Sequence, residues 1–168
     1  MTTNSAPATL SNLRLIQDDL LLAVDKYKFQ YICHQTNCLS NNAAGIAASI
    51  FAKYPEANVY VERVNGVNHR DRFSRISMHG PVINLYGQIA PGKPSDDPRS
   101  TDLPRHRMGA FKYGLSLIGQ IEGITSVAFP FGIGCGLARG NWEEYKQAIR
   151  RFATNHPAIR VGIFQKDR

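Results

Sequence analysis

The sequence of 168 residues lacks any long apolar run, whereas a membrane-spanning helix needs about 20 predominantly apolar residues in succession. The segment from Met1 to Ser11 has neither a basic start nor a hydrophobic stretch, so it does not resemble a secretory signal peptide. We expect residues 1–9 to form a flexible tail. These absences predict a protein without a membrane partner.

Cysteine is scarce as well. The chain has three cysteines, Cys33, Cys38 and Cys135, and an odd number does not suit the disulfide framework of a secreted protein. No Cys-x-x-Cys pair occurs and the histidines show no metal-ligand spacing, so we expect neither a metal site nor a cofactor. The scarcity of cysteine favours an intracellular protein, cytoplasmic or nuclear.

The composition is that of an ordinary soluble globule, with 43% hydrophobic and 20% charged residues. This length predicts a single domain over residues 10–168, which we expect to be a monomer. The net charge of +7 favours acidic partners such as nucleotides or nucleic acid, although a basic solvated surface would give the same value. The basic residues fall in separate regions, and no aromatic signature of RNA binding lies among them.

The hydrophobic pattern alternates between short apolar segments and helical periodicity. We expect strands over 9–16, 29–34, 75–78, 82–86, 124–129 and 159–164, and helices over 46–54, 108–118 and 142–152. Strands that alternate with helices predict an α/β protein, a three-layer α/β/α sandwich with a mixed central sheet. Between them, residues 89–104 contain four prolines and form either a lid, together with Tyr86 and Gln88, or an ordinary exposed connection.

Two segments break from a strand into polar or glycine-rich backbone and then enter a helical pattern. The first runs from Tyr31 to Asn37 and on through Asn41-Asn-Ala-Ala-Gly-Ile46, where small residues allow backbone amides to approach a ligand. The second is Phe129-Pro-Phe-Gly-Ile-Gly-Cys-Gly-Leu137, whose alternating glycines can wrap a diphosphate. It fits neither the Walker loop nor the dinucleotide fingerprint. Together the two loops predict a site for an anionic ligand.

The sequence resembles the macrodomain family over about residues 10 to 165. The resemblance is carried by His-Gln-Thr-Asn-Cys, Asn-Ala-Ala-Gly-Ile-Ala and Phe-Gly-Ile-Gly-Cys-Gly-Leu-Ala-Arg-Gly-Asn-Trp. It is greatest to the branch that holds ADP-ribose 1''-phosphate phosphatases and terminal ADP-ribose glycohydrolases. The resemblance implies a macrodomain-like fold and ADP-ribose, or a derivative, as the ligand.

The resemblance also implies roles for particular residues. Asp19 matches the acid that receives the adenine amino group, although it could equally be a turn or cap residue, or Asp18 could act in its place. Phe164 would lie near the adenine or be a core aromatic. The loops around the distal ribose and diphosphate would comprise Asn37, Asn42, Ala43, Ala44, Gly45 and Ile46, and Gly132, Ile133, Gly134, Cys135, Gly136 and Leu137.

His34 is the sharpest catalytic candidate, because a histidine at a strand end beside a phosphate loop can act as a general acid or base. Asn37 would hold the ribose. The alternative is a hydrogen-bonded structural histidine. Cys135 has no paired histidine by spacing, so we interpret it as a small packing residue. Ala138 stands where glycohydrolase relatives carry an acid after Gly-Cys-Gly-Leu, and no matching lysine is evident.

These observations predict hydrolysis at the distal ribose, by an ADP-ribose 1''-phosphate phosphatase or an ADP-ribosyl hydrolase. A non-catalytic reader of ADP-ribose or ADP-ribosylated protein is the alternative, and Ala138 favours it. Binding of poly(ADP-ribose) or RNA through the basic surface is a third possibility.

Overall fold

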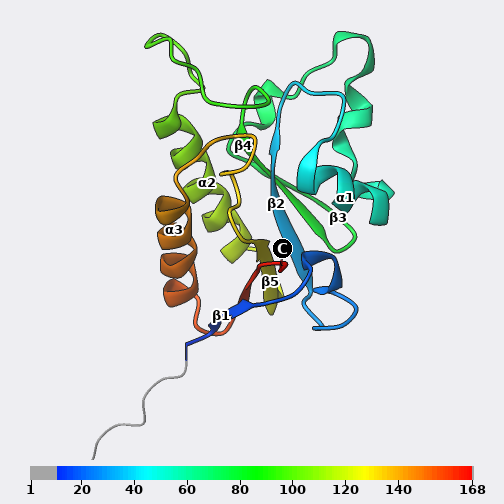
Figure 1. Cartoon of the computed structure of the whole chain (residues 1–168), viewed down its shortest axis with the longest axis vertical. Coiled ribbons are helices and arrows are strands. Elements are labelled where there is room, and N and C mark those ends of the chain that lie inside the picture. Colours follow the sequence, from blue (N-terminus) through cyan, green and yellow to red (C-terminus); the bar gives the residue numbers. More distant parts are fainter. Residues whose placement is uncertain (1–10, 168) are drawn as a thin grey trace, which may run out of the picture.

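The computed structural model describes residues 11–167, without the side chains of residues 64–66. A six-stranded sheet with the order β1-β6-β5-β2-β4-β3 forms the centre of the molecule. β3 pairs antiparallel with β4, and the other neighbours pair parallel. Helices α2 and α3 lie on one side of the sheet and α1 lies on the other (Figure 1). The predicted three-layer sandwich with a mixed sheet is confirmed.

The strands occur where the apolar segments predict them. They are β1 (Leu13–Ile16), β2 (Tyr31–Asn37), β3 (Ile76–His79), β4 (Val82–Gln88), β5 (Ser126–Pro130) and β6 (Arg160–Phe164). The first residues of the predicted strand 9–16, and the predicted tail 1–9, lie outside the described residues. β2 is longer than the expected strand 29–34, because Thr36 and Asn37 continue the pairing with β4 past the apolar residues. His34 is therefore inside β2, and the prediction that it lies at a strand end is wrong.

The helices follow the predicted periodicity, and prolines and caps set their ends. They are α1 (Gly45–Lys53), α2 (Pro104–Gly119) and α3 (Trp142–Asn155). α1 ends just before Pro55, which cannot continue a helix. Asn141 caps α3 by accepting a hydrogen bond from the backbone amide of Glu143 at 3.0 Å, as predicted. α2 begins earlier than expected, at Pro104, because proline is well suited to a first helical position.

Four short 3-10 helices complete the fold over residues 11–167. They are η1 (Leu20–Leu22), η2 (Pro55–Ala57), η3 (Val59–Gly66) and η4 (Arg70–Arg72). Three of them follow one another between α1 and β3, a segment whose sequence has no helical or strand periodicity. They bring Tyr60 and Arg63, both buried, next to the end of β2.

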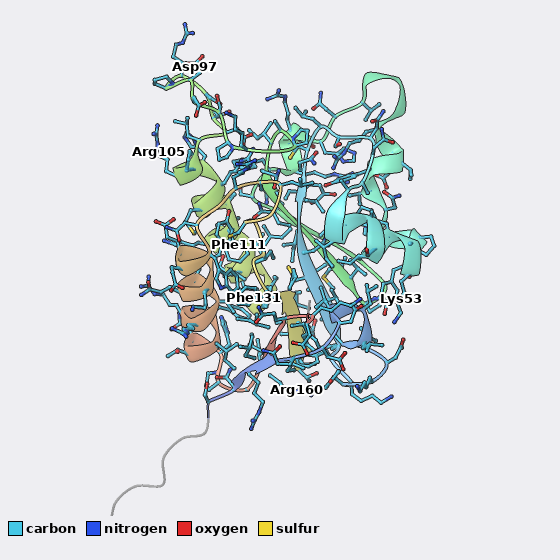
Figure 2. All side chains as sticks on the ribbon, viewed as in Figure 1. Lys53, Asp97, Arg105, Phe111, Phe131 and Arg160 are labelled. Atoms are coloured by element: carbon cyan, nitrogen blue, oxygen red, sulfur yellow. The ribbon has the colours of Figure 1, made fainter. Side chains whose placement is uncertain are left out.

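The sheet separates two apolar clusters. The first joins the sheet to α2 and α3 and contains Phe111, which is labelled in Figure 2, together with Leu85 and Ile149. The second joins the sheet to α1 and the short helices through residues such as Ile50 and Tyr60. With both faces covered, β2, β4 and β5 are almost wholly buried, which is why they appear as continuous apolar runs.

Parallel strands end at the same edge of a sheet. The carboxyl ends of β1, β6, β5, β2 and β4 are therefore neighbours, and the loops that follow them form the usual place for a ligand in open α/β sheets. Among the described residues, no helix has the length and apolar character needed to cross a bilayer.

Candidate functional site

A cavity of about 770 Å³ lies at the carboxyl edge of the sheet. This volume falls within the range of small-molecule sites. A second hollow of about 350 Å³ lies between the outer faces of α2 and α3, and its lining consists of helix side chains without a backbone loop. The larger cavity is the candidate site because segments following several strands meet there.

Most of the residues selected from the sequence line this cavity. They are Asp19, Asn37, Asn42, Ala44, Gly45, Ile46, Gly132, Ile133, Gly134, Gly136, Leu137 and Phe164. The lining does not include His34, Ala43 or Cys135. The structure thus brings both predicted loops to one cavity, together with the residues after β1 and at the end of β6.

The first loop is held by the side chain of Asn37. Its Oδ1 accepts hydrogen bonds from the backbone amides of Leu39 at 3.1 Å and Ser40 at 2.7 Å, and its Nδ2 donates to the Tyr60 hydroxyl at 3.2 Å. The loop then enters α1 at Gly45, whose φ of +57° favours a residue without a Cβ. The N-cap, Ala44, makes no side-chain capping bond, and the start of α1 lines the cavity. The first-turn backbone amides of α1 are therefore available to a ligand bound there.

The second loop turns on glycines with positive φ. Gly132 has φ +72° and Gly134 has φ +73°. The amide of Gly140 donates to the Gly134 carbonyl at 2.9 Å, which closes the loop against α3. Among the described residues, the backbone amides of Gly134, Gly136 and Leu137 have no protein acceptor, and all three residues line the cavity. Unpaired amides that converge on a cavity form a site for an anion.

Asp19 lines the cavity and is also a helix cap, so the cap interpretation is confirmed and its role toward an adenine stays a prediction. Its Oδ1 accepts from the Leu21 amide at 2.9 Å, and its Oδ2 pairs with Nζ of Lys166 at 3.0 Å. The Leu21 hydrogen bond, followed by Lys166, lowers the pKa of the Asp19 carboxyl. Asp18 instead bonds Lys26 and the Tyr27 hydroxyl and does not line the cavity.

Phe164 likewise belongs to the core and to the cavity wall. Its ring is 2% exposed and meets the rings of Tyr27 and Phe29 edge-on, with centroids at 5.3 Å and 5.5 Å. It lines the cavity beside Lys166. The ring is therefore held rigidly, and only a small part of it faces the cavity.

His34 lies on the α1 side of the sheet, away from the cavity. Its side chain is fully buried, its Nε2 is 2.6 Å from Oδ1 of Asn84, and its ring meets Phe51 edge-on at 5.2 Å. Burial lowers the pKa of His34 to about 4, so the imidazole is neutral at physiological pH. This is the alternative, a hydrogen-bonded structural histidine, and we assign His34 no catalytic step.

Cys135 and Ala43 belong to the two loops without lining the cavity. The Cys135 thiol donates to the Ile133 carbonyl at 3.2 Å, and burial raises its pKa to about 11. It is a thiol, not a thiolate, at neutral pH, consistent with the packing role inferred from sequence. Ala138 lines the cavity with a methyl group and is 8% exposed.

Sequence reasoning missed part of the lining, namely Leu20, Gln35, Ser40, Ala47, Tyr60, Pro130, Phe131, Gln165 and Lys166. Side-chain alternation along β2 could have identified Gln35, because it lies two residues before Asn37. Proximity to Phe164 could have identified Gln165 and Lys166. Tyr60 could not have been found, since η3 carries no pattern that places it against β2.

The segment 89–104 contributes Pro91 and Gly92 to the cavity wall, beside Gln88. Its base is fixed by a buried ion pair, in which Nη2 of Arg107 lies 2.7 Å from Oδ2 of Asp102. Arg107 also donates to the carbonyl of Gly92, and Asp102 accepts from the amide of Ala90. The loop projects beyond α2, with Asp97 far from the sheet (Figure 2). Tyr86 is buried and does not line the cavity.

No family model matches the sequence, and no curated protein matches it either. Solved structures do. The macrodomain of Thermus aquaticus DarG is 20% identical with a TM-score of 0.61, and the similarity covers 91% of this chain and 97% of that one. The macrodomain of Mycobacterium tuberculosis DarG is 19% identical with a TM-score of 0.63, covering 92% and 99%.

A protein of unknown function from Bacteroides thetaiotaomicron is 22% identical with a TM-score of 0.66, covering 92% and 98%. A mutant of the Oceanobacillus iheyensis macrodomain is 15% identical with a TM-score of 0.62, covering 92% and 84%. Similarity at this level of identity concerns the backbone, and it extends over nearly the whole chain. The protein has the macrodomain fold.

Proposed function

We propose that this protein binds ADP-ribose or a derivative of it in the cavity at the carboxyl edge of the sheet. The diphosphate would rest on the two loops, the adenine near Asp19 and Phe164, and the distal ribose near Asn37. The observation that carries the proposal is the convergence of unpaired amides from the second loop and the start of α1 on one cavity.

The charges of the lining suit this ligand. Asp19 is the one carboxylate among the lining residues, and Lys166 neutralises it. A diphosphate would therefore meet amide dipoles and no unpaired negative charge. Near the proposed adenine position the wall includes the apolar side chains of Leu20 and Phe164.

Binding without turnover is the function that the side chains support best. The lining contains no histidine, cysteine or glutamate, and Asp19 lies at the end proposed for the adenine. General acid–base catalysis needs a titratable group within hydrogen-bond reach of the reacting atoms. Asn37, Gln35 and Gln88 carry amides, which can orient water or substrate but do not exchange a proton at neutral pH.

Hydrolysis at the distal ribose, by a phosphatase or an ADP-ribosyl hydrolase, is a second candidate. It is favoured by the cluster of the Asn37, Gln35 and Gln88 side chains at the proposed ribose end, where they could position a water. Release of inorganic phosphate or free ADP-ribose, measured beside binding, distinguishes the two candidates.

Titration calorimetry and thermal shift with ADP-ribose test the binding proposal. At 100 times the dissociation constant the ligand should stabilise the fold by about 2.7 kcal/mol and raise Tm by roughly 5–10 °C. Gly136→Val should weaken affinity roughly tenfold or more with little change in Tm of the free protein. The reason is that a Cβ at Gly136 meets no protein atom within 4 Å, yet the residue lines the cavity.

Gly109→Ala is the matched control, because Gly109 is exposed on α2 and has equally open space around its Cβ. It should leave the affinity for ADP-ribose unchanged. A wild-type protein that gives neither heat nor thermal shift with ADP-ribose would disprove the proposal.

A further inference from the structure

Asp102 and Arg107 form a buried ion pair at the base of the segment 89–104, and we call these two residues the clamp. They are 6% and 2% exposed. The pair is joined at two points, because Nε of Arg107 donates to Oδ1 of Asp102 at 2.9 Å and Nη2 donates to Oδ2 at 2.7 Å. This fork geometry fixes both side chains at the start of α2.

The clamp also binds the main chain of residues 89–93. Its partners there are the amides of Ile89 and Ala90, which donate to Asp102, and the carbonyls of Ala90, Gly92 and Lys93, which accept from Arg107. The donor–acceptor distances of these five hydrogen bonds lie between 2.6 and 3.2 Å. A short stretch of backbone is thereby tied to two buried charges.

The ion pair by itself adds little net stability. Both charges lose their hydration on burial, and apolar side chains of similar volume often stabilise a protein equally well or better. An apolar pair, however, could not hydrogen-bond the main-chain groups of residues 89–93. What the charged pair provides in particular is therefore the conformation of this backbone.

The backbone that the clamp holds is a wall of the cavity. Pro91 and Gly92 line the cavity, together with Gln88, which lies opposite Asn37 in the pairing of β4 with β2. In the sheet, β5 and β2 separate β4 from β1 and β6. The wall is thus at the Asn37 end of the cavity, remote from Asp19, and this is the end proposed for the distal ribose.

The sequence left open whether the segment 89–104 is a lid or an ordinary connection. A lid has to move, and movement of residues 89–93 would break hydrogen bonds to the clamp. Buried charged groups that lose their partners are costly. The part of the segment next to the cavity therefore has the contacts of a fixed wall.

We propose that Asp102 and Arg107 are positioning residues for the ligand, which hold residues 89–93 as a fixed wall around the distal ribose. This proposal rests on the proposed binding of ADP-ribose. A wall that is already in place costs no ordering when the ligand binds, so it contributes to affinity for the part of the ligand beyond the diphosphate.

The test compares the affinities for ADP-ribose and for ADP, which lacks the distal ribose, by calorimetry in the wild type and in Arg107→Lys. Lysine keeps the charge beside Asp102, but its compact ammonium cannot replace the planar fork that also reaches the carbonyls of Gly92 and Lys93. The wild type should bind ADP-ribose roughly tenfold more tightly than ADP. Arg107→Lys should reduce this ratio roughly fivefold, with the affinity for ADP within about twofold of the wild type.

Arg99→Lys is the matched control, because it makes the same substitution in the same segment. The Arg99 side chain is 91% exposed, pairs with Asp97 at 3.1 Å and does not line the cavity. Exposed ion pairs contribute little, so the ratio of the two affinities should stay within about twofold of the wild type.

Hydrogen exchange of the wild type tests the wall even where Arg107→Lys does not fold. The amides of Ile89 and Ala90 donate to the buried Asp102 carboxylate, so their exchange should be slowed on the order of 10³-fold relative to an unfolded chain. Rapid exchange of both amides contradicts the proposal.

Three outcomes of calorimetry contradict the proposal as well. They are equal affinities of the wild type for ADP-ribose and ADP, an unchanged ratio in Arg107→Lys, and an equal loss of affinity for both ligands in that variant. A wild type that binds neither ligand contradicts the proposed function instead, so the two failures can be told apart.

Discussion

His34 has a neutral imidazole in the middle of the sheet, and its surroundings cannot accommodate the charged form. Asn84 donates from Nδ2 to the Ala57 carbonyl at 3.0 Å, which directs its Oδ1 to Nε2 of His34. Nε2 therefore carries the proton, and the buried Nδ1 has no hydrogen-bond partner among the described residues. Protonation would place an N–H donor and a charge there without an acceptor.

This arrangement predicts a loss of stability on mild acidification. The pKa of His34 is about 4 in the folded protein and near 6.5 when unfolded, so the unfolded chain binds more protons between these pH values. The stabilisation is complete above pH 6.5 and falls by about 3 kcal/mol as the pH drops to 4. Urea unfolding of the wild type and His34→Gln at several pH values measures it, and the variant should lose most of this slope.

His79→Gln, at the partly exposed end of β3, is the control and should keep the wild-type slope. An identical pH dependence in His34→Gln and the wild type would show that His34 does not titrate in this way.

At the scale of single residues, the sequence was a better guide to the positions of the loop glycines than to the position of the catalytic candidate, His34. Glycines and small residues after a strand have few structural alternatives, so the sequence was enough to predict that Gly45, Gly132 and Gly134 belong to loops at strand ends, and all three line the cavity. The position of His34 could not be predicted in this way, because one residue of strand register decides which face of a sheet a side chain occupies. Gln35, its neighbour, lines the cavity.

At the scale of elements, α3 supports the second loop through Tyr145. A Cβ on Gly134 would lie 2.6 Å from the Tyr145 ring, and a Cβ on Gly140 would lie 2.5 Å from the Gly134 carbonyl oxygen. Tyr145 is itself buried against Phe111, with ring centroids at 4.7 Å. The loop therefore packs directly on the core, so its backbone is held in place before any ligand binds.

Gly134→Ala should consequently reduce stability and affinity together. The positive φ of +73° costs about 1–2 kcal/mol for a residue with a Cβ, and the contact with Tyr145 adds to this. We expect a loss of about 2 kcal/mol or more in urea unfolding and a clear loss of ADP-ribose affinity by calorimetry. Gly109→Ala, on the exposed face of α2, should instead keep or slightly raise stability. Unchanged affinity in Gly134→Ala would show that the loop does not hold the ligand.

The periodic elements were predictable because each of them has an apolar face that repeats in sequence. The long segments between these elements could not be predicted in the same way. The clamp between Asp102 and Arg107 depends on two charged residues becoming buried together, which no local pattern indicates. The short helices η2 to η4 likewise owe their place to packing on the sheet, and with them Tyr60 and Arg63 were beyond sequence reasoning.

At the scale of the whole molecule, charge and cavity are separate features. The chain carries a net charge of +7, yet Lys166 is the one lysine or arginine among the cavity-lining residues, and it is already paired with Asp19. The net charge could be counted from the sequence, whereas which residues line the cavity depends on the long-range pairing of the strands. The excess positive charge therefore belongs to residues outside the cavity lining.

This separation predicts a weak effect of salt on ADP-ribose binding. Amide dipoles hold the proposed diphosphate and release few counterions, so affinity should change less than about threefold between 50 and 200 mM salt. A protein that neutralises six or more phosphates of RNA or poly(ADP-ribose) loses on the order of 10³-fold over the same range. Calorimetry with ADP-ribose and fluorescence anisotropy with a single-stranded RNA measure the two slopes. A steep slope for ADP-ribose would place its phosphates on the basic surface and not in the cavity.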